Sequence, residues 1–289
     1  MQAEMPTQAV IRTGQRLSHV RQTTLGSTVC VSGIGMHTGA ESRVALKPAG
    51  KGCGICFVTG GTRINAVAAN VTNTRRCTGL GLGAARVDTV EHLLSALSAL
   101  QVDNCDIAVD GPELPILDGS ALPWVKAILD AGIAELDERV YPLRLTHPVV
   151  LNMDSTWIAA CPSDSYSITC VTHFDHPMLR TDIFTYSGDP SDYRRDLAPA
   201  RTFGFAEEVE ALLQAGLARG GSLDNALIIH RDRFSDALRV PQEWLRHKTV
   251  DLIGDLSLVG SRFHAVVTAI RPSHHANVAF AARLMEALA

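Results

Sequence analysis

The chain has 289 residues, of which 46% are hydrophobic and 19% are charged, and its formal net charge is -4. This length allows one large domain or two ordinary ones. The acidic balance argues against a protein that binds nucleic acid through a general basic surface. No stretch approaches the ~20 apolar residues of a membrane span. The seven cysteines are odd in number and scattered, so reduced thiols in a cytoplasmic protein are expected.

The first half of the chain begins with strand patterns and continues with helix patterns. Residues 24–71 contain short β-rich stretches that are broken by Gly and Pro, which is typical of strands and turns. Hydrophobic periodicity then predicts a helix at about residues 90–100, a strand at 104–109 and a helix at 121–131.

The second half repeats this order of elements. Four strands, two helices, a strand and a terminal helix are predicted at about residues 148–152, 157–161, 166–172, 182–186, 206–217, 241–259, 265–270 and 277–288. The segment DERVYPLRL separates the halves, so we predict an N-terminal domain of residues 1–137 and a C-terminal domain of residues 145–289. Strands followed by helices in both halves indicate an α+β fold with two domains of sheets packed on helices.

The segment HKTVDLIGD carries the most informative pattern. In a helix, His247, Asp251 and Asp255 follow one another at a spacing of four residues and form one polar line on a single face. The residues around that line are apolar, and unpaired charge on a buried helix is costly. Ligation of a metal ion would satisfy these side chains. The alternative is a helix whose His and Asp side chains pair with each other or with solvent.

Glu91 and His92 stand at the start of the first predicted helix. Together with His247 and Asp251, His92 gives two histidines and one carboxylate, which leave a fourth zinc position open, as in catalytic sites. The helix N-terminus favours an ionised Glu91, as a general base that takes a proton from water requires. Alternatively, Glu91 forms a capping box with Asp88, and His92 lies at the edge of the core.

Two further segments add candidate catalytic groups. His274 and His275 lie in RPSHHANVAF, and a histidine near a metal site suits a general acid that protonates a leaving amine. Asp255 is then free to orient that histidine and hold it protonated. Thr202, in ARTFGF, suits a hydrogen-bond donor to a developing oxyanion. The alternatives are a polar turn with Asn277 as a helix cap, and a capping role for Thr202.

Eight segments in a fixed order resemble the UDP-3-O-acyl-N-acetylglucosamine deacetylase family, the zinc hydrolases of lipid A synthesis. The resemblance covers nearly the whole chain, from about Thr24 to the C-terminal helix. The segments are GIGMHTG (33–39), TVEHLLSAL (89–97), DNCDI (103–107), GPELPILDGSA (111–121), ARTFGF (200–205), GGSLDNALI (220–228), RHKTVDLIGDL (246–256) and H-x-x-N (274–277). The resemblance implies two domains of similar α+β layering, each with a small inserted subdomain, and an active site between them.

The same resemblance assigns the catalytic residues. The zinc ligands of the family fall on His92, His247 and Asp251, and its general base falls on Glu91. The catalytic histidine matches His274 by its spacing to Asn277 and Asp255. This chain reads S-H-H-A-N where the common pattern is G-H-x-x-N, so His275 is an additional residue.

The resemblance also assigns substrate contacts. Thr202 matches the threonine that contacts the oxyanion, and Lys248 matches a lysine near the polar end of the substrate. Phe203 and Phe174 match aromatic positions around the sugar and the uridine. The segment 207–217 falls where the family places its second insert, which forms an apolar passage for the acyl chain. An ordinary amphipathic helix explains the leucines of that segment equally well.

The implied reaction is hydrolysis of the 2-acetamido group of UDP-3-O-acyl-N-acetylglucosamine, which releases acetate and leaves a free amine. Zn²⁺ is the expected cofactor, and His/His/Asp ligation also accepts Fe²⁺. The expected partner is the acylated UDP-amino-sugar alone, without nucleic acid, and the enzyme is expected to be a cytoplasmic monomer with no transmembrane segment. The rival hypotheses are a zinc amidohydrolase for another acylated amine and a binding protein without catalysis. The complete catalytic set counts against a binding protein.

Overall fold

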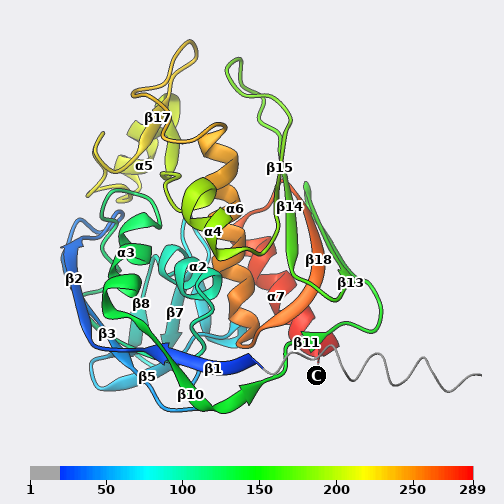
Figure 1. Cartoon of the computed structure of the whole chain (residues 1–289). Coiled ribbons are helices and arrows are strands. Elements are labelled where there is room, and N and C mark those ends of the chain that lie inside the picture. Colours follow the sequence, from blue (N-terminus) through cyan, green and yellow to red (C-terminus); the bar gives the residue numbers. More distant parts are fainter. Residues whose placement is uncertain (1–19, 289) are drawn as a thin grey trace, which may run out of the picture.

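Two sheets with the same strand arrangement flank the helices of the described chain, residues 20–288 (Figure 1). The structure is a computed structural model. The strands of the first sheet are β2 (Val29–Ile34), β3 (Glu41–Pro48), β4 (Ile55–Thr59), β5 (Thr62–Asn65) and β9 (Cys105–Asp110). Its order is β2-β3-β9-β4-β5, with β9 antiparallel to β3 and parallel to β4.

The second sheet repeats this topology with different residues. Its strands are β12 (Val149–Met153), β13 (Thr156–Pro162), β14 (Ser167–Thr172), β15 (Asp182–Tyr186) and β18 (Phe263–Ile270). The order is β12-β13-β18-β14-β15, with β18 antiparallel to β13 and parallel to β14. Both sheets therefore consist of two hairpins separated by a central strand that comes later in the chain.

The longer helices occupy equivalent places in the two halves. They are α2 (Glu91–Ala99), α3 (Leu122–Ala131), α6 (Glu243–Leu256) and α7 (His274–Leu288). In the chain, α2 and α3 flank β9 as α6 and α7 flank β18. Figure 1 shows α2, α6 and α7 in the middle of the molecule, with strands of the two sheets on either side. The predicted α+β fold with two similar sheet-on-helix arrangements is confirmed.

Each half carries a small insert between its second hairpin and its first long helix, as expected. The first insert is a three-stranded sheet of β6 (Val71–Asn73), β7 (Gly79–Leu82) and β8 (Ala85–Val87). The second insert pairs β16 (Phe203–Phe205) in parallel with β17 (Leu227–Ile229), and the 3-10 turn η3 (Ala206–Glu208) and helix α5 (Val209–Gln214) lie between these strands. In Figure 1, α5 and β17 form the top of the molecule.

The remaining elements connect the halves. Strand β1 (Val20–Leu25) pairs antiparallel with β10 (Ile133–Val140), and β11 (Leu143–Arg144) then pairs in parallel with β18. The short helical turns are η1 (Ala68–Asn70), α4 (Pro190–Asp192), the π-helical η2 (Tyr193–Leu197) and η4 (Ser257–Val259). The division into domains of residues 1–137 and 145–289 stays a prediction, and residues 1–19 lie outside the described part of the chain.

The predicted elements are confirmed, with corrections at their ends. The helix expected at 206–217 is shorter, because Gly216 adopts a left-handed backbone (φ 76°) that ends the helical path of α5. The last helix begins at His274 rather than at residue 277, since the backbone N–H of Asn277 already donates to the carbonyl of Ser273 at 2.8 Å. Asn277 is therefore inside the helix, and its expected role as a cap is wrong.

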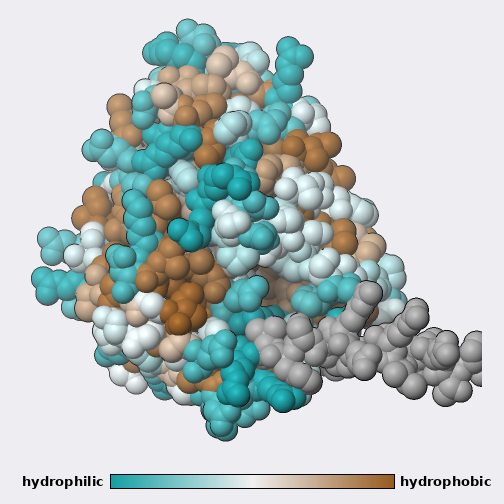
Figure 2. Space-filling model, in the orientation of Figure 1, coloured by the Kyte–Doolittle hydropathy of each residue, from teal (hydrophilic) through white to brown (hydrophobic). Residues whose placement is uncertain are grey.

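Apolar side chains from both sheets and from the helices form one continuous core. It includes Phe57 of β4, Leu93 of α2, Leu252 of α6, Val267 of β18 and Phe280 of α7, each with no exposed surface. Burying a side chain of this size contributes about 1.5–3 kcal/mol. On the face in view, Figure 2 shows hydrophobic side chains gathered over the region of α3, with hydrophilic ones around them. Among residues 20–288, no helix has the length and apolar character to cross a membrane.

Helices α2 and α6 come into close contact where Gly254 meets Glu91. A Cβ atom added to Gly254 would lie 2.1 Å from the backbone carbonyl oxygen of Glu91, far inside van der Waals contact. A larger residue would have to push one helix backbone away from the other. The glycine therefore fixes the distance between the helix that carries His92 and the helix that carries His247 and Asp251.

We predict that Gly254→Ala destabilises the protein by about 1–3 kcal/mol, because the added methyl group overpacks a contact between two backbones. The urea concentration at the midpoint of unfolding measures this effect. Gly50→Ala is a matched control, since the nearest atom to its Cβ is the sulfur of Cys53 at 3.8 Å. An equal stability for the Gly254 variant and the wild type would contradict the tight contact between the helices.

Candidate active site

A cavity of about 1030 Å³ lies at the N-terminal end of α2 and is lined by both halves of the chain and by both inserts. Its polar end is lined by Glu91, His92, His247, Lys248, Asp251 and His274. Its apolar end is lined by Phe174, Phe203, Phe205, Leu212, Leu213 and Ile228. A smaller cavity of about 350 Å³ lies at the other end of α2, beside Ser98 and Tyr166, and contains none of the predicted site residues. The larger cavity is the candidate site.

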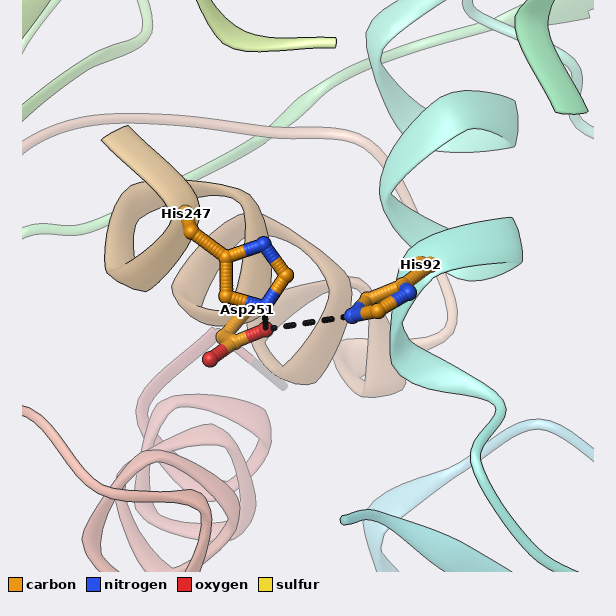
Figure 3. Close-up of side chains that lie close together, drawn as sticks. All are labelled: His92, His247 and Asp251. Atoms are coloured by element: carbon orange, nitrogen blue, oxygen red, sulfur yellow. Dashed lines mark ion pairs between the residues drawn. The ribbon is translucent and has the colours of Figure 1, made fainter. Parts of the chain in front are cut away.

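Three predicted metal ligands meet at the polar end of this cavity. His92 comes from α2, and His247 and Asp251 come from consecutive turns of α6 (Figure 3). The Nε2 atoms of His92 and His247 lie 3.6 Å and 3.4 Å from the Oδ1 atom of Asp251. One donor atom from each residue lies within 4.8 Å of the others. All three side chains are buried.

These distances fit a metal ion better than direct hydrogen bonds. Donor atoms bound 2.0–2.1 Å from a tetrahedral zinc ion lie about 3.3 Å apart, close to the separations seen here. The Oδ1 atom of Asp251 is buried and has no hydrogen-bond partner, although a buried carboxylate oxygen normally has one. Two imidazoles and an orphaned carboxylate oxygen therefore fit a divalent ion such as zinc.

The other oxygen of Asp251 is satisfied by a lysine. The Nζ atom of Lys248 donates to Oδ2 of Asp251 at 2.8 Å. Burial alone would raise the pKa of Asp251, but the charge of Lys248 holds that pKa well below its usual range. The carboxylate is therefore ionised, as a metal ligand must be.

His247 is oriented by a backbone carbonyl. Its Nδ1 atom lies 3.1 Å from the carbonyl oxygen of Ala200. A proton on Nδ1 that donates to this oxygen leaves the lone pair of Nε2 directed toward Asp251. Burial lowers the pKa of His247 to about 4, which favours the neutral imidazole that binds metal ions.

Glu91 lies at the first position of α2, beside the three candidate ligands. The backbone N–H of Thr78 donates to its Oε2 atom at 2.9 Å. Val90 is the N-cap of α2, without a side-chain cap, so the alternative of a capping box between Asp88 and Glu91 is wrong. Burial raises the pKa of Glu91, and the neighbouring His274 offsets only part of this effect. A carboxylate with a raised pKa is a stronger base near neutral pH.

His274 stands opposite Asp255, one turn beyond Asp251 on α6. The Nδ1 atom of His274 lies 2.9 Å from Oδ2 of Asp255. Burial lowers the pKa of His274, but the charge and hydrogen bond of Asp255 outweigh burial and raise the pKa to about 9. The Nε2 atom of His274 lies 3.9 Å from Asp251, so the ring spans the space between the two aspartates. His275 is exposed.

The carboxylate of Asp255 is held by Thr78, which sequence reasoning missed, and by Asn277, whose contact with Asp255 it did not predict. The hydroxyl of Thr78 donates to Oδ1 at 2.5 Å, and the side-chain amide of Asn277 donates to Oδ2 at 2.9 Å. Thr78 therefore contacts both Asp255 and Glu91. Thr78 lies in TRRCTGL, where no local pattern marked it as a site residue. Its neighbour Cys77 is buried, and the amide of Asn73 lies 3.5 Å from its sulfur.

Thr202 lines the cavity next to a buried ion pair. Its backbone N–H donates to the carbonyl of Gly119 at 2.8 Å. The helical segment that follows has Phe205 as its N-cap and no side-chain cap, so the capping alternative for Thr202 is wrong. The preceding residue, Arg201, is 2% exposed, and its Nε atom lies 2.8 Å from Glu243, the first residue of α6. This pair joins the segment that carries Thr202, directly before β16, to the helix that carries the candidate ligands. The sequence does not indicate that Glu243 is the partner of Arg201, because the two residues are 42 positions apart.

The aromatic residues of the cavity pack edge to face. The ring of Phe174 lies 5.9 Å from Phe203 and 5.5 Å from Phe205, and all three line the cavity. Phe205 was not among the predicted contacts. Val209, Leu212 and other side chains of η3 and α5 continue the apolar wall. Two of the three leucines of the predicted helix at 206–217, Leu212 and Leu213, thus line the cavity.

Comparisons with known proteins agree with this geometry. Residues 22–286 match the family model described as UDP-3-O-acyl N-acetylglycosamine deacetylase. A UDP-3-O-acyl-N-acetylglucosamine deacetylase of Anaeromyxobacter sp. is 38% identical over 93% of this chain and 90% of its own length. Enzymes of the same name from Syntrophotalea carbinolica and Acidithiobacillus ferrooxidans are 40% and 41% identical, over 89% and 83% of this chain and 85% and 82% of their own lengths. The chain belongs to the UDP-3-O-acyl N-acetylglycosamine deacetylase family.

Proposed function

We propose that this chain hydrolyses the acetamido group of UDP-3-O-acyl-N-acetylglucosamine, releasing acetate and leaving a free amine, as a step of lipid A biosynthesis. Its family and the names of its relatives support this substrate. The observation that carries the chemistry is the convergence of His92, His247 and Asp251 on one point of the cavity, with Glu91 and His274 beside it. Hydrolysis of an amide requires a strong nucleophile, a stabilised oxyanion and an acid for the amine.

His92, His247 and Asp251 would hold one divalent metal ion, and we propose Zn²⁺, with Fe²⁺ as the alternative that the same donor set accepts. When bound, the ion would polarise the acetamido carbonyl and lower the pKa of a water molecule. The unpaired Oδ1 atom of Asp251 supports this assignment. Lys248 keeps Asp251 ionised, so the carboxylate is ready to bind the ion.

Glu91 would accept a proton from the attacking water. It faces the same cavity as the candidate ligands and is fixed by the backbone N–H of Thr78. Its raised pKa supports this role, because a base with a pKa closer to neutral holds the transferred proton better. Burial also keeps bulk solvent from solvating the carboxylate.

Thr202 and His274 would act on the amide from two sides. The hydroxyl of Thr202 would donate to the oxygen that becomes negatively charged as the tetrahedral intermediate forms. His274, held protonated by Asp255, would stabilise this charge and then donate its Nε2 proton to the leaving nitrogen. A separate acid is needed because an unprotonated amine is a poor leaving group.

The rest of the cavity suits an amphiphilic substrate. Lys248 would lie near the polar end of the sugar, and Phe203 and Phe174 would contact the sugar and the uridine. The apolar end, at α5, would hold the 3-O-acyl chain. A volume of about 1030 Å³ is large enough for a sugar nucleotide with part of an acyl chain.

We also propose that the enzyme acts as a monomer in the cytoplasm. All groups assigned to the reaction come from one chain, so a single copy would form a complete site. The seven cysteines are free thiols, as expected of a reducing compartment. No second function is favoured by a specific observation.

The first experiment is to measure acetate release from UDP-3-O-acyl-N-acetylglucosamine by the native protein, after chelation, and after return of one equivalent of zinc. We expect activity to disappear with the metal and to return with it. Release that is unaffected by chelation would contradict the metal role of His92, His247 and Asp251. A folded, zinc-loaded protein without activity would point to another acylated amine or to a binding protein.

Asp255→Asn should retain the metal and lower turnover, because Asp255 contacts His274 and not the three ligands. The acid form of His274 exists below its pKa, so the rate of the wild type should fall as pH rises through about 9. Without the charge of Asp255 the pKa of His274 is lower, and the alkaline fall should move to lower pH. The measurements are metal content and the pH profile of kcat. Loss of metal in this variant would show that Asp255 belongs to the ligand set.

His274→Ala should reduce kcat by about 10²–10⁴-fold, the usual contribution of a general acid. His275→Ala serves as a matched control and should have a mild effect, because this neighbouring side chain is exposed. Steady-state acetate release measures both variants. The opposite order of effects would mean that the wrong histidine of the pair has been assigned.

A further inference from the structure

The second insert, residues 203–229, is fixed to the first half of the chain on one side of the cavity. The backbone N–H of Gly220 donates to the carbonyl of Met36 at 3.0 Å, and that of Arg219 donates to the carbonyl of His37 at 3.3 Å. A Cβ atom on Gly220 would lie 2.2 Å from the carbonyl oxygen of Gly35. These backbone contacts leave little freedom on this side.

On the other side, one ion pair connects the second insert to the first insert. The Nη2 atom of Arg76, in the turn between β6 and β7, lies 3.0 Å from Oε2 of Glu208, at the end of η3. Both residues line the cavity, and their side chains are 52% and 42% exposed. Within residues 20–288, no other side-chain hydrogen bond or ion pair joins residues 71–87 to residues 203–229.

The segment between these two attachments is loosely packed. Neither η3 nor α5 contains a buried residue. The side chains of Val209, Leu212 and Leu213 instead line the cavity, and Leu213 is 50% exposed. Segments with few buried contacts open at a small fraction of the global unfolding free energy. The wall formed by α5 is thus fixed by backbone contacts at one end and held by an exposed ion pair at the other.

Arg76 also belongs to the turn that supports the catalytic carboxylates. Its backbone is left-handed, with φ 65°, a conformation that is uncommon for residues other than glycine. Two residues later, Thr78 donates hydrogen bonds to Glu91 and Asp255. The ion pair therefore joins the wall of the apolar end to the segment that positions the polar end.

We propose that Arg76 and Glu208 form a latch that closes α5 over the acyl chain of the substrate and so favours acylated over unacylated UDP-sugars. This inference rests on the proposed function for the identity of the substrate. An exposed ion pair is weak and screened by salt, so the latch opens readily for entry and release of the chain. When the pair is closed, the apolar side chains of α5 are held against the ligand.

The latch is tested first by hydrogen–deuterium exchange on the free protein, without substrate. Arg76→Gln and Glu208→Gln should each speed exchange of the amides in residues 206–217 by about 1.5- to 5-fold, the range expected for loss of an exposed ion pair. The charge exchange Arg76→Glu with Glu208→Arg should restore slow exchange. The control is Arg63→Gln, which removes the Arg63–Asp106 pair of the first sheet, whose side chains are 52% and 30% exposed. Unchanged exchange in both single variants would overturn the latch.

Specificity is tested by kcat/KM for UDP-3-O-acyl-N-acetylglucosamine and for the same sugar nucleotide without the acyl chain. Each single variant should lose about 1.5- to 5-fold on the acylated substrate only, and the charge exchange should recover the loss. An equal loss on both substrates would overturn the role in specificity. A wild-type protein inactive on both would refute the proposed function, while the exchange experiment would still decide whether the latch exists.

Discussion

The contact between α2 and α6 is the constraint on which the site depends. Each helix comes from a different half of the chain, at an equivalent place in the repeated order of elements. At Gly254 the backbone of α6 lies directly against Glu91 of α2. This proximity allows His92 to reach Asp251 and His247 on the other helix. A site made by two helices in a common core is held by the packing of that core, which resists small displacements.

The carboxyl groups buried near this contact differ in their surroundings, because each has different neighbours. Asp251 is ionised beside Lys248, whereas burial raises the pKa of Glu91. Asp255 is surrounded by donors from Thr78 and His274. Three carboxylates within one site would repel one another in the absence of such partners. Their different surroundings suit the roles proposed for them, Asp251 as a metal ligand, Glu91 as a base and Asp255 as the support of an acid.

The two inserts extend this centre into a cavity with a polar end and an apolar end. The first insert contributes Thr78, which reaches the catalytic carboxylates, and Arg76 at the cavity wall. The second contributes the apolar side chains of α5, and Thr202, directly before this insert in the chain, also lines the cavity. The repeated framework thus supplies the candidate metal ligands, and the inserts give the cavity surroundings that suit the proposed substrate, which has both a charged and an apolar part. The buried pair of Arg201 and Glu243 fixes the second insert to the start of α6.

The sequence alone determined the elements and the composition of the metal site. Periodicity located α2, α6 and β18, and the four-residue spacing put His247 and Asp251 on one helix face, because both depend on contacts close in the chain. The matched segments, in their fixed order, indicated the family and selected His274 as the candidate catalytic histidine. Only the tertiary structure decided the partners of these residues. Thr78 and Asp255 are 177 positions apart, and Arg201 and Glu243 are 42 apart. No local pattern encodes such pairs. The capping alternatives for Glu91 and Asn277 were wrong, because the fold gives these side chains other partners, Thr78 for Glu91 and Asp255 for Asn277.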